Sequence, residues 1–245
     1  MSRPLHFAFL HGGGQGGWIW DETLAALGQQ TAGADFRAKA FDLPGCGSKR
    51  NMDTSRLTVR DVAEVFVAEL AASGLAPCIL VGHSNAGTIL PIVAELRPEL
   101  VRRYVYVSCI APPPGQTIRE VMRPRHPIDE AETATQADLS ERLRRMFCND
   151  MGEPQASAFL AKLGHDHWPT IQALSETDWR YDQLQGHPAT YVICLQDQTL
   201  SPEWQEDFAS RLGVQRRVYI DAGHQVMNTR PYGLAEILLN EETAP

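Results

Sequence analysis

Ser84 stands where an apolar run at residues 78–82 passes directly into a second apolar run with helical spacing. The residues two positions away on either side, Gly82 and Ala86, are both small. A sharp turn from strand to helix needs small residues there because the chain crowds itself, and it strains the backbone of the central serine. The pattern predicts a nucleophile elbow with Ser84 as nucleophile, although Ala86 and then Gly87 stand where glycine is usual. The competing interpretation is a serine that caps an ordinary helix.

A serine hydroxyl is a weak nucleophile unless a base accepts its proton and a third group orients that base. After an elbow, the acid is expected behind the next-to-last strand and the histidine behind the last one. Asp197 follows an apolar run at 189–195, and His224 follows another at 218–221. We therefore predict His224 as the general base and Asp197 as the acid that orients it. The alternative acids are Asp221, Asp166, Asp178 and Asp182.

Two backbone N–H groups are needed to hold the negative charge that develops on a substrate carbonyl. The residue after the nucleophile, Asn85, is expected to supply one of them. The other is expected from the run His-Gly-Gly-Gly at 11–14, where glycine lets the backbone approach a substrate closely. Gly12, Gly14 and Gly17 also match a dinucleotide-binding pattern, but no acidic residue ends the second strand at the ribose position. We therefore expect Gly12 and Gly14 beside a substrate.

Strand and helix patterns alternate around these residues. Strands are expected at 5–10, 36–43, 78–82, 104–109, 189–195 and 218–221, and helices at 18–29, from Thr58 to Gly74, at 85–96, from Ser201 to Gly213 and at 231–239. Thr58 is a candidate N-cap with Asp61 three residues on, and the helix at 85–96 is apolar almost all round, so it should be deeply buried. Such alternation predicts an α/β fold with about six parallel strands and helices on both faces.

The alternation stops between residues 109 and 188, where a run of three prolines precedes polar helical patterns. Structureless loops of that length are rare, so an inserted, mostly helical cap is expected at 109–188 on a core made of 1–108 and 189–245. Large apolar residues in it could line a substrate pocket or seat the cap on the core: Met146, Phe147, Trp168 and Trp179. His165 and His167 have a spacing that could bind a metal, but no third ligand is evident, and no metal site is expected.

Composition narrows the function classes. The chain has 245 residues with 43% hydrophobic and 21% charged residues, and a formal net charge of −8. That balance disfavours binding to nucleic acid or to an anionic membrane. No window approaches 18 apolar residues, so no membrane span is expected. The five cysteines are at least 31 residues apart, which favours reduced, buried thiols and a cytoplasmic location.

Together these motifs resemble the α/β-hydrolase superfamily over about residues 5–108 and 189–240. The resemblance rests on the glycine run at 11–14, the turn Asp-Leu-Pro-Gly-Cys-Gly-Ser at 42–48, the elbow, Asp197 and Gly-His at 223–224. Residues 11–20 and 197–205 are similar to the plant methylesterase and hydroxynitrile lyase subgroup. The resemblance implies a serine-nucleophile hydrolase, six parallel strands without an antiparallel pair before them, and Gly13 as the second oxyanion donor.

Two departures from that subgroup bear on the reaction. Its hydroxynitrile lyases carry lysine directly after the catalytic histidine and threonine on the glycine loop, where this chain has Gln225 and Gly13. Because that lysine stabilises departing cyanide, lyase activity is disfavoured. Relatives of this fold that open epoxides or remove halogen use an aspartate nucleophile, which Ser84 disfavours.

The sequence therefore predicts a carboxylesterase-like serine hydrolase that cleaves a small to medium apolar or aromatic ester through an acyl-enzyme. Cleavage of an amide, a carbamate or a carbon–carbon bond, and a non-catalytic ligand receptor on the same scaffold, are the open alternatives. The expected partner is a small-molecule substrate without a cofactor, and a homodimer is compatible with the sequence. His11 and His83 are expected to shape the backbone rather than react, and Asp42 to close a turn.

Overall fold

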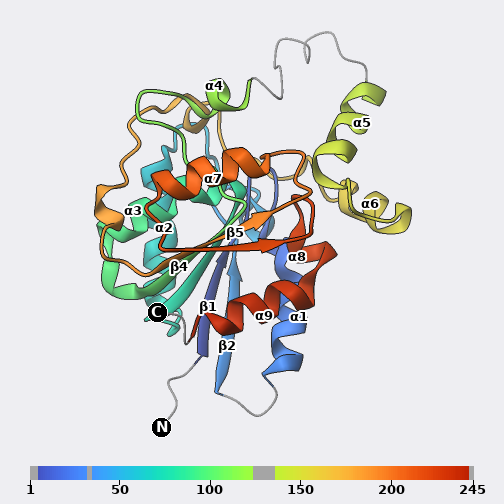
Figure 1. Ribbon diagram of the computed structural model, residues 1–245. Helices are drawn as coiled ribbons and strands as arrows, with labels where there is room; N and C mark the ends of the chain where they lie inside the picture. The colour runs from blue at the N-terminus through green and yellow to red at the C-terminus, as the bar shows by residue number, and fades with distance from the viewer. Residues whose placement is uncertain (1–4, 32–34, 124–135, 243–245) are drawn as a thin grey trace.

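The computed structural model describes residues 5–31, 35–123 and 136–242. Its centre is a six-stranded sheet in the order β2-β1-β3-β4-β5-β6, with every neighbouring pair parallel (Figure 1). The strands are β1 (Leu5–Leu10), β2 (Phe36–Phe41), β3 (Cys78–His83), β4 (Val101–Val107), β5 (Ala189–Cys194) and β6 (Arg216–Ile220). The predicted α/β fold with six parallel strands is confirmed.

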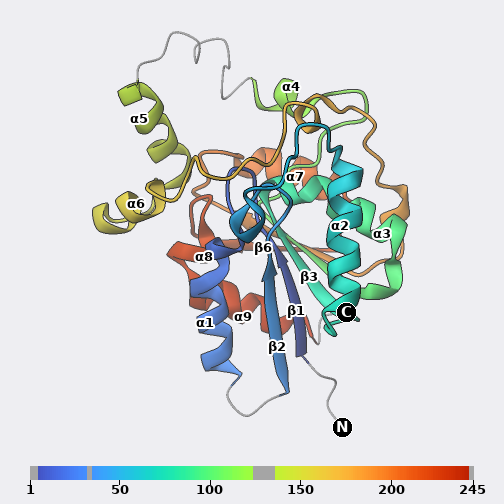
Figure 2. The ribbon, with the colours of Figure 1, turned by 180° about the vertical axis from the view of Figure 1, so that it is seen from behind.

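Helices cover both faces of the sheet, as Figures 1 and 2 show from opposite sides. One face carries α1 (Asp21–Gln30), α8 (Val226–Thr229) and α9 (Pro231–Asn240), and the other carries α2 (Val59–Ala72), α3 (Leu90–Leu96) and α7 (Pro202–Arg211). Side chains alternate along the buried strands, so Phe7 and Phe9 face the first group while Ala8 and Leu10 face the second. The two apolar layers thus stabilise the sheet from both faces, and the sheet in turn determines the position of the loops at its carboxyl edge.

Local signals set several helix ends as predicted. The side chain of Thr58 accepts a hydrogen bond from Asp61 N, and the Asp61 carboxylate accepts from Thr58 N, which makes a capping box at the start of α2. Gly74 follows α2 with a φ of +71°, a conformation that glycine adopts without steric cost. Ser201 caps α7, whose first residue is proline.

The predicted helix at 85–96 is divided in the structure. A 3-10 turn, Ser84–Thr88, comes first and α3 follows it. Pro91 explains the division, because it has no N–H to donate to Gly87 and its ring would crowd that carbonyl in a continuous α-helix. Leu90, Val93 and Ala94 are buried, whereas Ile92 and Leu96 are only partly buried, so the expected deep burial holds for one side of α3.

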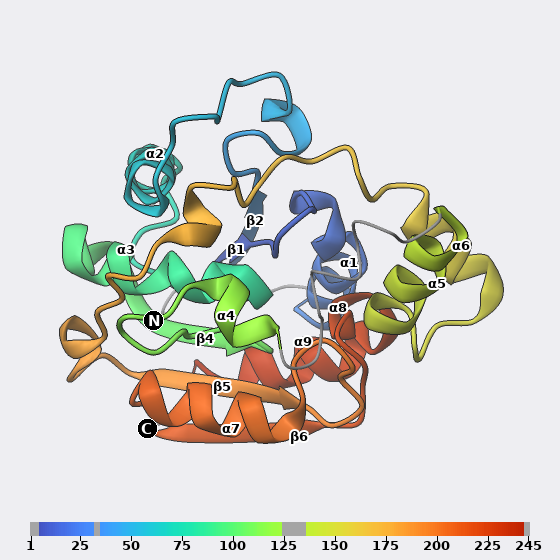
Figure 3. The same ribbon diagram turned by 90° about the horizontal axis from the view of Figure 1, so that it is seen from above.

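The segment between β4 and β5 carries α4 (Ile118–Met122), α5 (Gln136–Phe147) and α6 (Glu153–Leu160), with two short 3-10 turns. All regular structure that the structure describes at 109–188 is helical. Seen from above, α4 lies over the middle of the sheet while α5 and α6 lie at one side, near α1 and α8 (Figure 3). Within the described ranges, no helix is both long and apolar enough to span a lipid bilayer.

Candidate active site

Three side chains from the carboxyl edge of the sheet meet at one point. Ser84 follows β3, Asp197 follows β5 and His224 follows β6. His224 Nε2 lies 3.1 Å from Ser84 Oγ, and His224 Nδ1 lies 2.7 Å from Asp197 Oδ2. Because Nδ1–H donates to the carboxylate, Nε2 is left as an acceptor that faces the serine hydroxyl. This arrangement allows His224 to take the Ser84 proton.

The backbone around Ser84 has the strained geometry that the sequence predicts. Its φ is +53°, in the left-handed region that residues with a Cβ rarely occupy. A Cβ added to Gly82 would lie 3.1 Å from the Ala86 Cβ, so both positions have to stay small. One added to Gly87 would lie only 2.1 Å from the Ile110 carbonyl oxygen. The turn therefore tolerates alanine at 86 and needs glycine at 87.

Asp197 is almost fully buried and has its carboxylate held on both oxygens. Oδ1 accepts hydrogen bonds from Thr199 N at 2.7 Å and Leu200 N at 2.9 Å, while the Gln205 amide lies 3.4 Å from Oδ2. These donors stabilise the ionised carboxylate and aim Oδ2 at His224.

The alternative acids lie elsewhere. Asp221 is exposed and accepts from the Gln196 amide, and Asp166 is paired with Arg50. Asp178 and Asp182 are exposed. Within the described structure, Asp197 is therefore the aspartate that His224 contacts.

The glycine loop packs directly against the nucleophile turn. A Cβ added to Gly12 would lie 2.9 Å from the Ser84 Cβ, and one added to Gly13 would lie 3.8 Å from the Asn85 Cβ. Asn85 is in the first turn of the 3-10 helix, where backbone N–H groups have no partner within the helix. The Gly14 N–H donates to the Trp168 carbonyl at 2.6 Å, so it is occupied. The two residues predicted as oxyanion donors thus lie next to each other and next to Ser84.

His11 and His83 hold loops together. His11 Nε2 accepts from Leu43 N at 3.1 Å, and His83 Nε2 donates to the His224 carbonyl at 3.0 Å. Burial lowers the pKa of His11, and burial together with nearby His224 lowers the pKa of His83 well below 6.5. Both rings are neutral at physiological pH. Asp42 closes its turn as expected, because its carboxylate accepts from Gly17 N and Ser48 N.

The large apolar residues predicted near a substrate lie in different places. The Trp168 carbonyl is bonded to the glycine loop, and the following Pro169 is 2.8 Å from the Cβ position of Gly13. The Met146 carbonyl accepts from the Thr199 hydroxyl, beside the loop that carries Asp197. Trp179 donates to the Gln116 carbonyl and lines a cavity of about 290 Å³ that is bordered by α2 and α3 and not by Ser84 or His224.

Ser108 at the site was not predicted from the sequence, and Phe147 was named only as a residue that could line a pocket or seat the cap. The Ser108 hydroxyl lies 2.5 Å from Asp197 Oδ2 and 3.3 Å from His224 Nδ1. It is a polar residue at the carboxyl end of a central strand, a place where parallel sheets collect functional groups, and this signal could have identified it. The Phe147 ring lies 5.7 Å from the His224 ring, between centroids, and no sequence signal separates it from a packing residue.

Other nucleophiles and metals have little support at this site. All five cysteines are free and buried, and burial raises the pKa of Cys46 and of Cys78 to about 12, so these thiols stay protonated. Across residues 5–31, 35–123 and 136–242, no three His, Cys, Asp or Glu side chains are grouped so that they could hold a metal ion. His165 and His167 are exposed on either side of the Asp166–Arg50 pair.

Comparison with known proteins gives consistent results. A profile described as "Alpha/beta hydrolase family" matches residues 7–237. Salicylic acid-binding protein 2 of Nicotiana tabacum is 24% identical over 98% of this chain and 97% of its own length. Polyneuridine aldehyde esterase of Rauvolfia serpentina is also 24% identical, over 98% of this chain and 96% of its own length. The structure of an extracellular alpha/beta-hydrolase from a Paenibacillus species superposes with a TM-score of 0.78 at 21% identity, over 97% of this chain and 99% of that one.

Proposed function

The chain belongs to the alpha/beta hydrolase family, and from this we propose that it is a serine carboxylesterase with Ser84, His224 and Asp197 as its catalytic triad. The observation that carries the proposal is the hydrogen-bonded series Ser84 Oγ, His224 Nε2, His224 Nδ1 and Asp197 Oδ2, with steps of 3.1 and 2.7 Å. The esterase named among its relatives supports the same class of reaction.

The reaction proceeds in two halves. Ser84 Oγ attacks the ester carbonyl while its proton moves to His224 Nε2, and Asp197 stabilises the imidazolium that forms. Collapse of the tetrahedral intermediate breaks the bond to the alcohol, which leaves with the proton from His224. Water then gives a proton to His224 and attacks the acyl-serine, which releases the carboxylic acid and restores Ser84.

Charge on the carbonyl oxygen is held by backbone N–H groups of Gly13 and Asn85. Each such donor contributes about 3–4 kcal/mol to stabilising the transition state in comparable sites. Support comes from the contact of Gly12 with Ser84 and the adjacency of Gly13 and Asn85. Gly12 and Gly14 complete the loop that approaches the substrate.

The substrate class is a small to medium ester with an apolar or aromatic part. Phe147 beside His224 and Pro169 beside Gly13 support this, because both bring apolar groups close to the proposed reacting centre. We assign residues 109–188 as the cap that contributes these groups. Gln225, which is fully buried directly after His224, replaces the lysine that a hydroxynitrile lyase would need.

A reducing compartment such as the cytoplasm fits the five free, buried thiols. The homodimer stays a prediction, which sedimentation velocity of the purified protein would test.

The direct test is multiple-turnover hydrolysis of p-nitrophenyl acetate and butyrate by the wild type and by Ser84→Ala. We expect sustained turnover that falls by about 10³-fold or more in the variant. Ser55→Ala, on an exposed loop, is the matched control and should keep full activity. Equal rates in wild type and Ser84→Ala would exclude the proposed nucleophile. Tight ligand binding without turnover would indicate the receptor alternative.

A further inference from the structure

The turn that follows β4, residues 108–110, contacts all three members of the proposed triad. The Ser108 hydroxyl lies 2.5 Å from Asp197 Oδ2 and 3.3 Å from His224 Nδ1. Two residues later, Ile110 N donates to the Ser84 carbonyl at 3.0 Å. One short turn is therefore bonded to the nucleophile, the base and the acid.

Ser108 occupies this place at a conformational cost. Its φ is +41°, a region that disfavours any residue with a Cβ, and Ser84 is the other non-glycine residue with positive φ in the described chain. Glycine would adopt this conformation freely, but it has no hydroxyl. Ser108 is also fully buried, and its N–H donates to the Val192 carbonyl at 3.1 Å, which fixes the direction of its side chain. What serine supplies here, and glycine cannot, is the hydroxyl beside Asp197.

The hydroxyl can serve both neighbours at once. A serine hydroxyl has one hydrogen to donate and two lone pairs to accept. Donation to Asp197 Oδ2 leaves a lone pair that faces the Nδ1–H of His224, so the three groups close a ring of hydrogen bonds. When His224 takes the Ser84 proton, its charged Nδ1–H then has two acceptors, the carboxylate and the Ser108 oxygen. Hydrogen bonds to a charged group are stronger than neutral ones, so the ring tightens as the reaction proceeds.

We propose that Ser108 is a positioning residue of the active site, which holds Asp197 and His224 in register and helps to stabilise the imidazolium. The role goes beyond the triad and rests on the proposed function. In the proposed reaction, Ser108 does not contact the substrate and acts through Asp197 and His224.

The kinetic test compares Ser108→Ala and Ser108→Gly with the wild type. Alanine removes the hydroxyl and keeps the backbone cost, whereas glycine removes both. We expect kcat to fall about tenfold in both variants while KM stays unchanged, the scale of one lost hydrogen bond to a charged group. Ser73→Ala is the control, because it also deletes a hydroxyl with two hydrogen bonds, to Leu70 O and from Leu75 N, far from the site. Full kcat in folded Ser108→Gly or Ser108→Ala would overturn the proposal.

A second readout needs no substrate. The proton between His224 Nδ1 and Asp197 should give a far-downfield proton NMR resonance, assigned by its loss in His224→Gln. We expect that resonance to move, or to be lost to exchange with water, in both Ser108 variants and to stay in place in Ser73→Ala. An unchanged resonance in both Ser108 variants overturns the proposal even if the esterase assays fail. A changed resonance without Ser84-dependent turnover supports the role of Ser108 and rejects the ester substrate.

Discussion

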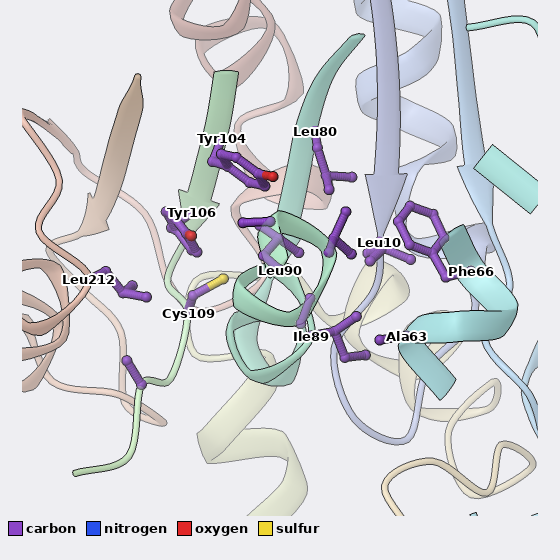
Figure 4. Packing of buried hydrophobic residues seen from close by; sticks show 14 of the residues in the cluster. Leu10, Ala63, Phe66, Leu80, Ile89, Leu90, Tyr104, Tyr106, Cys109 and Leu212 are labelled. Carbon is purple, nitrogen blue, oxygen red and sulfur yellow. The ribbon is translucent and has the colours of Figure 1, made fainter. Parts of the chain in front are cut away.

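The sheet core and the segment at 109–188 are stabilised by different combinations of contacts. In the core, whole strands are buried: every residue of β3 and β5 is buried, and Leu80, Leu90, Tyr104 and Tyr106 pack in one continuous layer (Figure 4). The segment also buries apolar side chains against both layers, among them Ile118, Trp168 and Phe159. It is fastened in addition by separate polar contacts, such as the Asp166 carboxylate to Gly47 N and Arg50. Apolar burial sets the position of the core, whereas apolar burial and individual hydrogen bonds together set the position of the segment.

The proposed active site lies where these two regions meet. Two residues that follow α5 bond to the loops that carry Asp197 and His224. Asn149 donates to the Gln196 carbonyl, and the Asp150 carboxylate accepts from Gly223 N. The core thus places the proposed catalytic side chains, and the segment holds the loops that carry Asp197 and His224. A change in the core should act on stability, whereas a change in the polar contacts should act on local order and turnover.

The largest effect is expected for Leu90→Ala. Leu90 is fully buried under the nucleophile turn, 2.9 Å from the Cβ position of Gly82, so its truncation leaves a cavity there. We expect the free energy of unfolding to fall by about 3–5 kcal/mol, measured by urea titration. Leu143→Ala, on the exposed side of α5, is the matched control and should change it by less than about 0.5 kcal/mol. Equal losses in the two variants would contradict the comparison.

A smaller and more local effect is expected for Asp166→Asn. The Asp166 carboxylate is fully buried and accepts from Gly47 N at 2.8 Å and from Arg50 at 3.0 and 3.1 Å. Since the Arg50 side chain is 42% exposed, water can replace part of the pair, and we expect a loss of about 1–2 kcal/mol.

This loss should appear as roughly tenfold faster amide hydrogen exchange at residues 166–168, with exchange in β3 unchanged. Asp178→Asn, whose carboxylate is 85% exposed, is the control and should leave exchange in both places as it is. Faster exchange across the whole sheet would mean that Asp166 supports the core as well.

A further effect, which appears only as the pH falls, is expected from His11 and His83. Their pKa values are lowered by burial, so as the pH falls these imidazoles bind protons more readily in the unfolded chain than in the folded one. Stability is therefore full above about pH 6.5 and falls as the pH drops below that value, by up to about 1.4 kcal/mol per pH unit for each histidine.

Urea titrations at about pH 7.5, 6.5 and 5.5 measure this slope. His83→Gln keeps an N–H donor for the His224 carbonyl but no longer titrates, so its slope should be about half that of the wild type. His167→Gln, at an exposed residue, is the control. A wild-type stability that rises below pH 6.5 would contradict the assignment of neutral, buried rings.

The difference between the core and the segment at 109–188 also explains which features could be predicted from the sequence. Strands such as β3 and β5 are nearly continuous apolar runs, and Gly82, Ala86 and Gly87 mark the turn between strand and helix, so their positions follow from periodicity and crowding. Ser84 was predicted from the small residues around it, and Asp197 and His224 from the chain order that follows a nucleophile elbow.

Contacts between segments that are distant in the sequence leave no periodic pattern in it. Nothing near Asp166 in the sequence specifies Arg50, 116 residues away, as its partner. The expected strand at 104–109 placed Ser108 inside the strand, whereas the strand ends at Val107 and Ser108 turns out of it with a positive φ. Its place at the carboxyl end of a central strand was the available signal, but the direction of its side chain was not. The division of the helix at Pro91 could have been read from the sequence, since proline lacks the N–H that a continuous helix needs.

The strand order has a consequence for the chain while it is being made. Ser84 and His224 are 140 residues apart, and β6, which leads to His224, lies at the edge of the sheet and pairs with β5. Translation from the amino end delivers the nucleophile turn long before the base reaches it. A nascent chain on the ribosome therefore holds the proposed nucleophile before the proposed base. The proposed triad is complete only after β6 has been synthesised and has paired with β5.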